Sequence, residues 1–319
     1  MLQHQPYKTK SPVLFIIFNR VDTTMLVLEQ IKLAKPDRIY ITADGPRPDR
    51  PEEAVKCAEA KAAVMANINW DCEIKTLFRE ENLGPKDAIS SAISWFFETE
   101  EEGIILEHDC LPAKSFFRFC DTLLDKYRYD ERIFLISGSN LLKGRKWGDA
   151  SYYFSQLSNA WGWAIWKRSW QGYDKDLVTY NESEVRSLLN KVFDNQFIID
   201  CWVRNFSLTK SGQINTWDYQ MTFQHFFSHR LNVAPNNNLV SNIGFGELAE
   251  NTVDADSVFA SIPLEEIDEI IHPRFILPEK EADTIVLLEE FKPIAEYLKK
   301  HNSLRRRFKR WIKKPFQKK

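Results

Sequence analysis

The sequence predicts an α/β fold in which helices flank a mixed, mainly parallel sheet. Short, continuous apolar runs alternate with segments of helical periodicity through the first half of the chain, and turn-forming residues separate them. With 319 residues, 44% of them hydrophobic, the chain is also long enough to bury one sizeable core beside a small appended lobe.

Five strands are expected, because short apolar runs alternate with helical patterns in this part of the chain, and the first of them reads as fully buried. They are Val13–Phe18, Arg38–Ala43, Glu73–Phe78, Gly103–Leu106 and Ile133–Ser137. Helical spacing predicts a helix after each of the first four strands, and Asp22 is expected to cap the first of these helices. Beyond Ser137 the pattern loosens into aromatic-rich loops and helices, with a last helix expected from about Asp283.

Polar side chains follow four of these strands, at the point where each strand ends. In open α/β sheets, ligands bind outside the carboxyl ends of the strands. The candidate binding segments are therefore Asn19-Arg20, Asp44-Gly45, the stretch from Arg79 to Asn82, and Glu107-His108-Asp109.

The turn after the first strand contains no glycine, since the first glycine of the chain is Gly45. Dinucleotide-binding Rossmann units and P-loops need glycines in that turn, because their backbone approaches phosphate closely. A sugar-phosphate nucleotidyltransferase would carry a glycine-rich first loop as well. The remaining possibility is a nucleotide diphosphate held by side chains and a divalent metal. Arg20 would supply fixed positive charge to phosphate, or else pair with Asp22 at the surface.

The acidic triplet Glu107-His108-Asp109 follows the fourth strand. Mg²⁺ or Mn²⁺ neutralises a diphosphate while using one or two protein carboxylates. Asp109 is the expected direct ligand, and Glu107 is expected to bind metal-bound water or hydroxyls of a donor sugar. His108 either packs structurally or is a borderline ligand suited to Mn²⁺. Alternatively, these acids end a strand and cap a helix that begins near Pro112.

Several segments, taken in order, carry a family resemblance over about residues 11–245. Together they resemble the GT-A glycosyltransferases, especially bacterial nucleotide-diphospho-sugar transferases related to the mannosyl-glycoprotein N-acetylglucosaminyltransferase type. The matching segments are Pro12-Val13-Leu14 through Phe18-Asn19-Arg20, Ala43-Asp44-Gly45, Glu80–Gly84, Glu107–Asp109, Trp161–Trp166 and Asn238–Gly244.

The resemblance implies a GT-A catalytic domain at residues 1–250. Its nucleotide-sugar half spans about 11–137 and its acceptor half about 138–250. Residues 251–319 would form a helical C-terminal extension. Two departures leave the metal ligands open. The triplet is Glu-His-Asp where close relatives have acids at the first two positions, and Glu250-Asn251-Thr252 stands where a late histidine is expected.

The resemblance also implies the roles of individual residues in the donor site. Arg20 would contact the donor phosphates, Asp44 the base of the nucleotide, and the triplet would hold the metal as a DxD-type motif does. The rest of the predicted nucleotide-sugar site is Asn19, Asn82 and Gly84.

The expected catalytic base is Asp218, within Thr216-Trp217-Asp218-Tyr219-Gln220. This assignment rests on the resemblance, because related enzymes carry the base in an Asp-rich segment after a late tryptophan. The alternative for Asp218 is a helix N-cap.

Four of the ten tryptophans lie between Trp161 and Trp170. Trp161 and Trp163 are predicted to offer an aromatic face to an acceptor sugar, whereas Trp166 and Trp170 are expected in the core.

His225 and His229 lie one helical turn apart, but no third ligand accompanies them. We therefore expect them on a helix surface rather than in a metal site.

The last fifteen residues, 305–319, contain nine Lys or Arg and no acid. The rest of the chain holds the other 34 basic residues of the 43, against 45 acidic ones, so its net charge is about −11. An acidic body argues against nucleic-acid binding. Leu304, Phe308, Trp311 and Ile312 share one helical face, which predicts an amphipathic helix on an anionic membrane; a solubilising tail is the alternative.

Five cysteines without CxxC spacing indicate a reducing compartment, and no apolar stretch approaches about 18 residues. We therefore expect a cytoplasmic protein, peripheral on the inner face of the cell membrane.

The predicted function is metal-dependent transfer of a sugar from a nucleotide-diphosphate donor, with UDP favoured, to a hydroxyl of a glycan or lipid-linked glycan. The transfer is expected to invert the anomeric centre and to serve the assembly of cell-surface polysaccharide or glycolipid. The alternatives are a sugar-phosphate nucleotidyltransferase and a non-catalytic glycan- or nucleotide-binding module.

Overall fold

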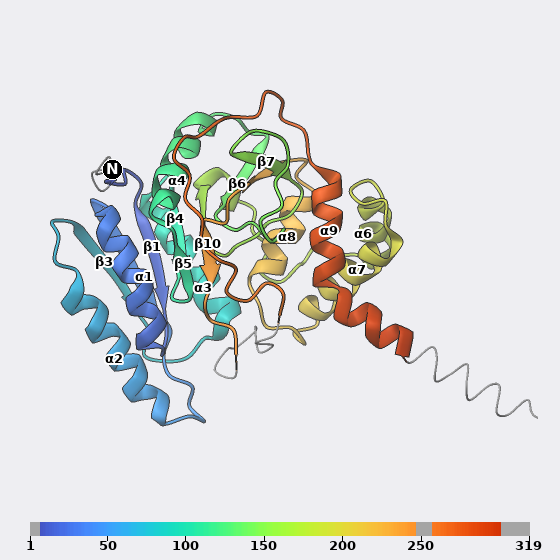
Figure 1. The fold of residues 1–319 in the computed structure, drawn as a ribbon. Coiled ribbons are helices and arrows are strands. Elements are labelled where there is room, and N and C mark those ends of the chain that lie inside the picture. The colour runs from blue at the N-terminus through green and yellow to red at the C-terminus, as the bar shows by residue number, and fades with distance from the viewer. Residues whose placement is uncertain (1–6, 247–256, 301–319) are drawn as a thin grey trace, which may run out of the picture.

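The computed structural model describes residues 7–246 and 257–300 (Figure 1). The predicted amphipathic tail and Glu250-Asn251-Thr252 lie outside the described residues. Within the described ranges, no helix combines the length and apolar character needed to cross a membrane.

The core is an eight-stranded sheet in the order β3-β2-β1-β4-β8-β6-β9-β7. Strands β1 to β4 pair in parallel, as the alternation of apolar runs and helices predicts. All five strands expected from the sequence are present. They are β1 (Val13–Ile17), β2 (Arg38–Ala43), β3 (Glu73–Phe78), β4 (Glu102–Glu107) and β6 (Ile133–Ser137).

The second half of the sheet contains strands that the sequence did not reveal. Strand β8 runs antiparallel to both β4 and β6, β9 is parallel to β6, and β7 is antiparallel to β9. A second, two-stranded sheet pairs β5 with β10. The bounds are β5 (Cys110–Pro112), β7 (Tyr152–Ser155), β8 (Trp163–Trp166), β9 (Leu231–Pro235) and β10 (Val240–Asn242). The sheet is therefore mixed and mainly parallel.

Helices cover both faces of the sheet, and the alternation of β1 side chains shows how. Phe15 and Ile17 pack with helices α1, α2 and α4 on one face, whereas Leu14 and Ile16 pack with α3 on the other. The bounds are α1 (Val21–Ala34), α2 (Glu52–Asn67), α3 (Gly84–Thr99) and α4 (Lys114–Tyr127). Asp22 lies in the first turn of α1, and Arg20 takes the N-cap position without a side-chain cap, so the predicted Asp22 cap is wrong.

The remaining helices, apart from the short helix α5, form a separate layer beside β7 and β9. Trp202, Phe226, Leu287 and Phe291 belong to one hydrophobic cluster there. The helix expected from about Asp283 begins three residues earlier. The bounds are α5 (Lys167–Trp170), α6 (Glu182–Leu189), α7 (Gln196–Lys210), α8 (Asp218–Phe226) and α9 (Lys280–Glu290).

The C-terminal segment returns along the edge of the sheet before it forms α9. The amide of Glu279 donates to the carbonyl of Phe154 in β7 at 2.8 Å. At the start of α9, the buried carboxylate of Asp283 accepts hydrogen bonds from Ser155 Oγ at 2.5 Å and Gln156 N at 2.7 Å. These contacts fix α9 to the end of β7.

Candidate active site

A cavity of about 1250 Å³ lies at the carboxyl ends of β1, β2 and β4. It is where an open α/β sheet is expected to bind its ligand. Ten of the eleven residues selected from the sequence line it, and the exception is Trp163. The ten are Asn19, Arg20, Asp44, Asn82, Gly84, Glu107, His108, Asp109, Trp161 and Asp218.

The turn after β1 brings Asn19 and Arg20 to the cavity. Arg20 Nη1 donates to the carbonyl of Gly244 at 3.0 Å, and Asn19 Nδ2 donates to Glu53 Oε1 at 3.3 Å. The described residues include no ion pair between Arg20 and Asp22, whose side chain is exposed. The Arg20 side chain therefore links the turn after β1 to the loop after β10.

The Asp44 carboxylate holds the neighbouring loop in place through hydrogen bonds. Its carboxylate accepts hydrogen bonds from Asn82 Nδ2 and from the amides of Leu83 and Gly84, each at 3.0–3.1 Å. Gly45 permits this close approach, because a Cβ there would lie 2.4 Å from the backbone carbon of Glu81. The contact of Asp44 with a nucleotide base, implied by the family resemblance, stays a prediction.

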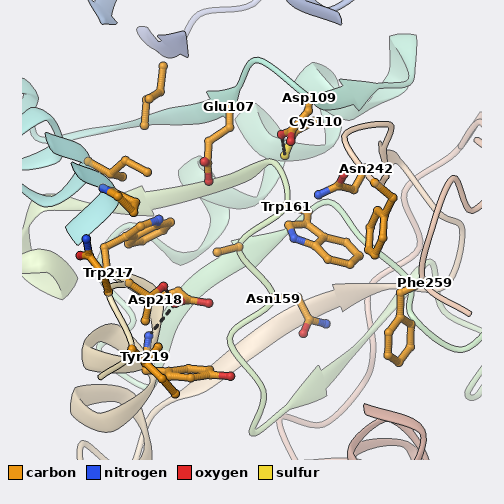
Figure 2. Close-up of a pocket in the computed structure, with 18 of the residues that line it drawn as sticks. Glu107, Asp109, Cys110, Asn159, Trp161, Trp217, Asp218, Tyr219, Asn242 and Phe259 are labelled. Carbon is orange, nitrogen blue, oxygen red and sulfur yellow. Dashed lines mark hydrogen bonds between the residues drawn. The ribbon is translucent and has the colours of Figure 1, made fainter. Parts of the chain in front are cut away.

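The acidic triplet begins with the last residue of β4 and ends just before β5, and all three side chains are half-buried on the cavity wall. Figure 2 shows the Glu107 carboxylate directed into the open space and Asp109 beside Cys110. Neither acid caps the following helix. Glu266 fills that role, because its carboxylate accepts from the amides of Lys114 and Ser115 at 3.1 and 2.8 Å. The alternative reading of the triplet as a helix cap is therefore wrong.

The described residues contain no group of three or more His, Cys, Asp or Glu side chains suited to hold a metal. Two carboxylates, Glu107 and Asp109, are nevertheless what Mg²⁺ or Mn²⁺ uses when nucleotide phosphates and water complete its shell. The loop after β10 fits closely around Asp109. A Cβ on Gly244 would lie 2.0 Å from Asp109 Oδ2, and the amide of Ile243 donates to the Asp109 carbonyl at 2.8 Å.

Replacing Gly244 with alanine should weaken metal binding without removing a ligand. The new methyl group must displace the Asp109 carboxylate, and disturbing the support of a metal ligand typically costs about 10–100-fold in metal affinity. Mn²⁺ titration in the presence of UDP measures the effect. Ile243→Ala in the same loop is the control and should bind Mn²⁺ normally. A folded Gly244→Ala protein with unchanged Mn²⁺ affinity would show that the loop around Asp109 does not support metal binding.

Asp218 is the first residue of α8 and faces the cavity from the wall opposite Trp161 (Figure 2). The hydroxyl of Thr216 and the amide of Tyr219 both donate to its Oδ1. Trp217, not Asp218, occupies the N-cap position of the helix. Burial raises the pKa of Asp218, which moves this carboxyl toward the range of an effective general base.

The tryptophan cluster divides between cavity and core. Trp161 is half-buried, lines the cavity and meets Phe245 edge-to-face at 5.6 Å. Trp163 is fully buried in β8 and stacks on Trp217 at 5.7 Å, so its prediction as an acceptor-binding residue is wrong. Strand alternation directs it into the core. Trp166 and Trp170 are buried, as expected.

His225 and His229 are not a pair on one helix surface. His225 is fully buried in α8, where its Nε2 lies 3.0 Å from the carbonyl of Arg230, and burial lowers its pKa to about 4. His229 lies beyond the end of α8 in a left-handed backbone conformation. The helix-surface expectation is therefore wrong, and His225 is a core residue.

Other charged residues line the cavity as well, among them Arg79 and Glu290, to which the sequence assigned no individual role. Arg79, within one of the segments that follow a strand, donates to the hydroxyls of Thr42 and Ser91, and burial lowers its pKa. Its position after β3 was a usable signal. Glu290 reaches the same cavity from α9, and nothing in the local sequence distinguishes it from the other surface acids of that helix.

No protein-family model matches the sequence, and no curated protein matches it. Solved structures share parts of the fold at low similarity. HddC from Yersinia pseudotuberculosis aligns at 10% identity and a TM-score of 0.31, covering 50% of this chain and 77% of its own. The apo-form glycosyltransferase GlyE of Streptococcus pneumoniae TIGR4 aligns at 12% identity and 0.31, covering 89% of this chain and 64% of its own. A cytidylyltransferase from Leptospira borgpetersenii aligns at 11% and 0.30, covering 50% and 60%.

Proposed function

We propose that this protein is a metal-dependent glycosyltransferase that moves a sugar from a nucleotide-diphosphate donor, with UDP favoured, to a hydroxyl of a glycan or lipid-linked glycan. One observation supports the proposal above the others. A single cavity holds the acidic pair after β4 and, on a different wall, the separate carboxylate of Asp218. Such a site has a place for a leaving group and a base for an incoming nucleophile.

The donor half of the cavity combines fixed cations with carboxylates. Arg20 would interact with the diphosphate, while Asp109, with Glu107 beside it, would hold Mn²⁺ or Mg²⁺. A bound divalent cation neutralises the negative charge of the departing nucleoside diphosphate. Asp44 would keep the Asn82–Gly84 loop in place beside the nucleotide, since its carboxylate binds that loop through several hydrogen bonds.

The acceptor half of the cavity would bind the acceptor, whose hydroxyl is the nucleophile. Trp161 would pack against a sugar ring, and Asp218 would remove the proton of the acceptor hydroxyl. The acceptor oxygen then bonds to the anomeric carbon while the bond to the diphosphate oxygen breaks, and that electron pair leaves with the nucleotide. Attack from the face opposite the leaving group inverts the anomeric centre. Positioned charge and a general base supply the rate enhancement.

The products of a reaction with activated sugars test the proposal. A panel of UDP- and GDP-sugars incubated with the protein and Mn²⁺ should release the nucleoside diphosphate, and EDTA should stop the release. Formation of pyrophosphate from a nucleoside triphosphate and a sugar phosphate would instead identify a nucleotidyltransferase. Binding of a nucleotide-sugar with no turnover in any acceptor mixture would favour a non-catalytic binding module.

The basic tail suggests where the enzyme works. We propose that residues 305–319, which lie outside the described part of the structure, attach it to the inner face of the cell membrane, where lipid-linked glycans are assembled. Each basic residue near an anionic surface contributes about 1 kcal/mol. A protein truncated after residue 302 should therefore lose sedimentation with phosphatidylglycerol vesicles and keep its catalytic activity in solution. Equal sedimentation of the truncated and full-length proteins would contradict this attachment.

A further inference from the structure

Half-buried aromatic side chains line one wall of the cavity, beside β10. Trp161 meets Phe245, which follows β10, edge-to-face at 5.6 Å. Phe259 comes from the turn at residues 257–261 and lines the same cavity. Figure 2 shows the Trp161 and Phe259 rings apart from each other, with Trp161 on the side of Asp109 and Phe259 beyond it. The wall therefore offers aromatic surface at two separate positions.

The Phe259 side chain takes no part in the core. It makes no ring contact with another aromatic residue of the ranges 7–246 and 257–300, and none of the three hydrophobic clusters found there includes it. Ligand sites are commonly lined by aromatic rings, and a bound ligand removes their remaining apolar surface from water. The half-buried ring of Phe259 is therefore available to a ligand.

Hydrogen bonds fix the turn that carries Phe259. The amide of Ser261 donates to the carbonyl of Asn242 in β10 at 3.0 Å. Just after the turn, the carbonyl of Ile262 accepts from Nδ2 of the buried Asn238, in the loop before β10, at 3.1 Å. Phe259 is thus held at a defined position relative to β10.

Asn242, the last residue of β10, brings a free hydrogen-bond donor to the same wall. The residue is only 4% exposed, and it lines the cavity. Its Oδ1 accepts from the amide of Gly244 at 2.8 Å, which sets the orientation of the side-chain amide. Among the described residues Nδ2 has no acceptor, and Figure 2 shows this nitrogen directed into the space beside Trp161. A nearly buried donor that lacks a partner favours a ligand oxygen that can accept from it.

Aromatic rings and amide groups on one wall suit a carbohydrate. The C–H faces of a sugar ring are apolar and its edge carries hydroxyls, so it can use both an aromatic surface and hydrogen-bonding side chains. Asn159 supplies a second amide, which lines the cavity and has no hydrogen-bond partner within the described ranges. A lipid chain would cover the rings and leave both amide groups unpaired.

We propose that this wall binds the acceptor as a glycan of at least two sugar units, the first against Trp161 and the next against Phe259. This inference rests on the proposed function. Asp218 faces the cavity from the wall opposite Trp161, so the unit that lies on Trp161 is the one presented to the base. Asn242 donates to a hydroxyl of that first unit, and Asn159 binds a further hydroxyl of the acceptor. Phe259 then selects for acceptors longer than one sugar.

Glycan binding tests this assignment and needs no turnover. With Mn²⁺ and UDP present, the protein is applied to an array of mono-, di- and trisaccharides, and the affinities of the strongest-bound glycans are then measured by calorimetry. A di- or trisaccharide should bind about two- to tenfold tighter than the monosaccharide at its terminus, as expected for one added aromatic contact. Phe259→Ala should remove this difference and leave monosaccharide binding unchanged.

Further variants separate the two positions on the wall. Phe259→Tyr keeps the ring and should retain the preference for the longer glycan. Phe275→Ala is the control, because it removes an exposed phenylalanine that contacts Arg274 outside the cavity. Asn242→Asp keeps the acceptor for the Gly244 amide but replaces the donor with an oxygen. It should therefore weaken the binding of mono- and disaccharides alike, by about tenfold.

The assignment would be overturned if longer glycans bound no tighter than single sugars, if no glycan bound at all, or if Phe259→Ala kept the wild-type preference. These results differ from a failure of the proposed function. If nucleoside diphosphate is released but Phe259→Ala keeps the wild-type ratio of kcat/KM for di- and monosaccharide acceptors, the transferase stands and the extended acceptor site falls. Glycan binding that depends on Phe259, without any release of nucleoside diphosphate, would support the glycan site and count against sugar transfer.

Discussion

Asp218→Asn should lower kcat by about 10²–10⁴-fold, the usual contribution of a general base. The amide keeps the volume of the side chain and can still accept from Thr216 and Tyr219, so the start of α8 is preserved. It cannot accept a proton from the acceptor hydroxyl. The affinity for the donor should stay within about twofold, because an interaction made only in the transition state affects kcat rather than ground-state binding.

Rates under saturating donor and acceptor, together with a separate titration of the donor, measure both quantities. Asp87→Asn is the matched control, because it also removes a carboxylate from the first turn of a helix, at a surface ion pair with Lys175. Its kcat should equal that of the wild type. Turnover of Asp218→Asn at the wild-type rate would remove Asp218 from the role of base.

Asp109→Asn should lower kcat/KM by about a thousandfold, since a metal ion contributes several kcal/mol of charge stabilisation and each 1.36 kcal/mol is tenfold in rate. The residual activity should no longer respond to Mn²⁺. Glu102→Gln provides the control, because it removes a carboxylate at the amino end of the same strand, where Glu102 pairs with Arg128 at 2.8 Å. A variant that keeps a normal Mn²⁺ response would place the metal elsewhere.

The donor half of the cavity was predictable because its parts are local. Strands β1 and β4 contain short apolar runs, and the candidate residues lie at or just beyond their ends: Arg20 follows β1, and Glu107 is the last residue of β4. The parallel arrangement then gathers these strand ends at one edge of the sheet. For Asp44, however, the sequence revealed the position and not the bonds to the Asn82–Gly84 loop, which depend on tertiary contact.

The acceptor half was harder to predict, because its elements are short and its contacts are long-range. Strand β8 is a four-residue strand among aromatic loops, and without it the inward direction of Trp163 could not be foreseen. Asp218 was found through the family resemblance alone. Glu290 reaches the cavity only because the chain returns along β7 and packs α9 on Trp202.

The central claim is that the carboxylates after β4 hold a divalent cation that in turn binds a nucleoside diphosphate. Water-proton relaxation with Mn²⁺ measures this directly and needs no acceptor. For the wild type, adding UDP or GDP should tighten Mn²⁺ binding and form a ternary complex, and Asp109→Asn should form none. Nucleotide binding that is equally tight in EDTA, or an unchanged ternary complex in the variant, would contradict the account.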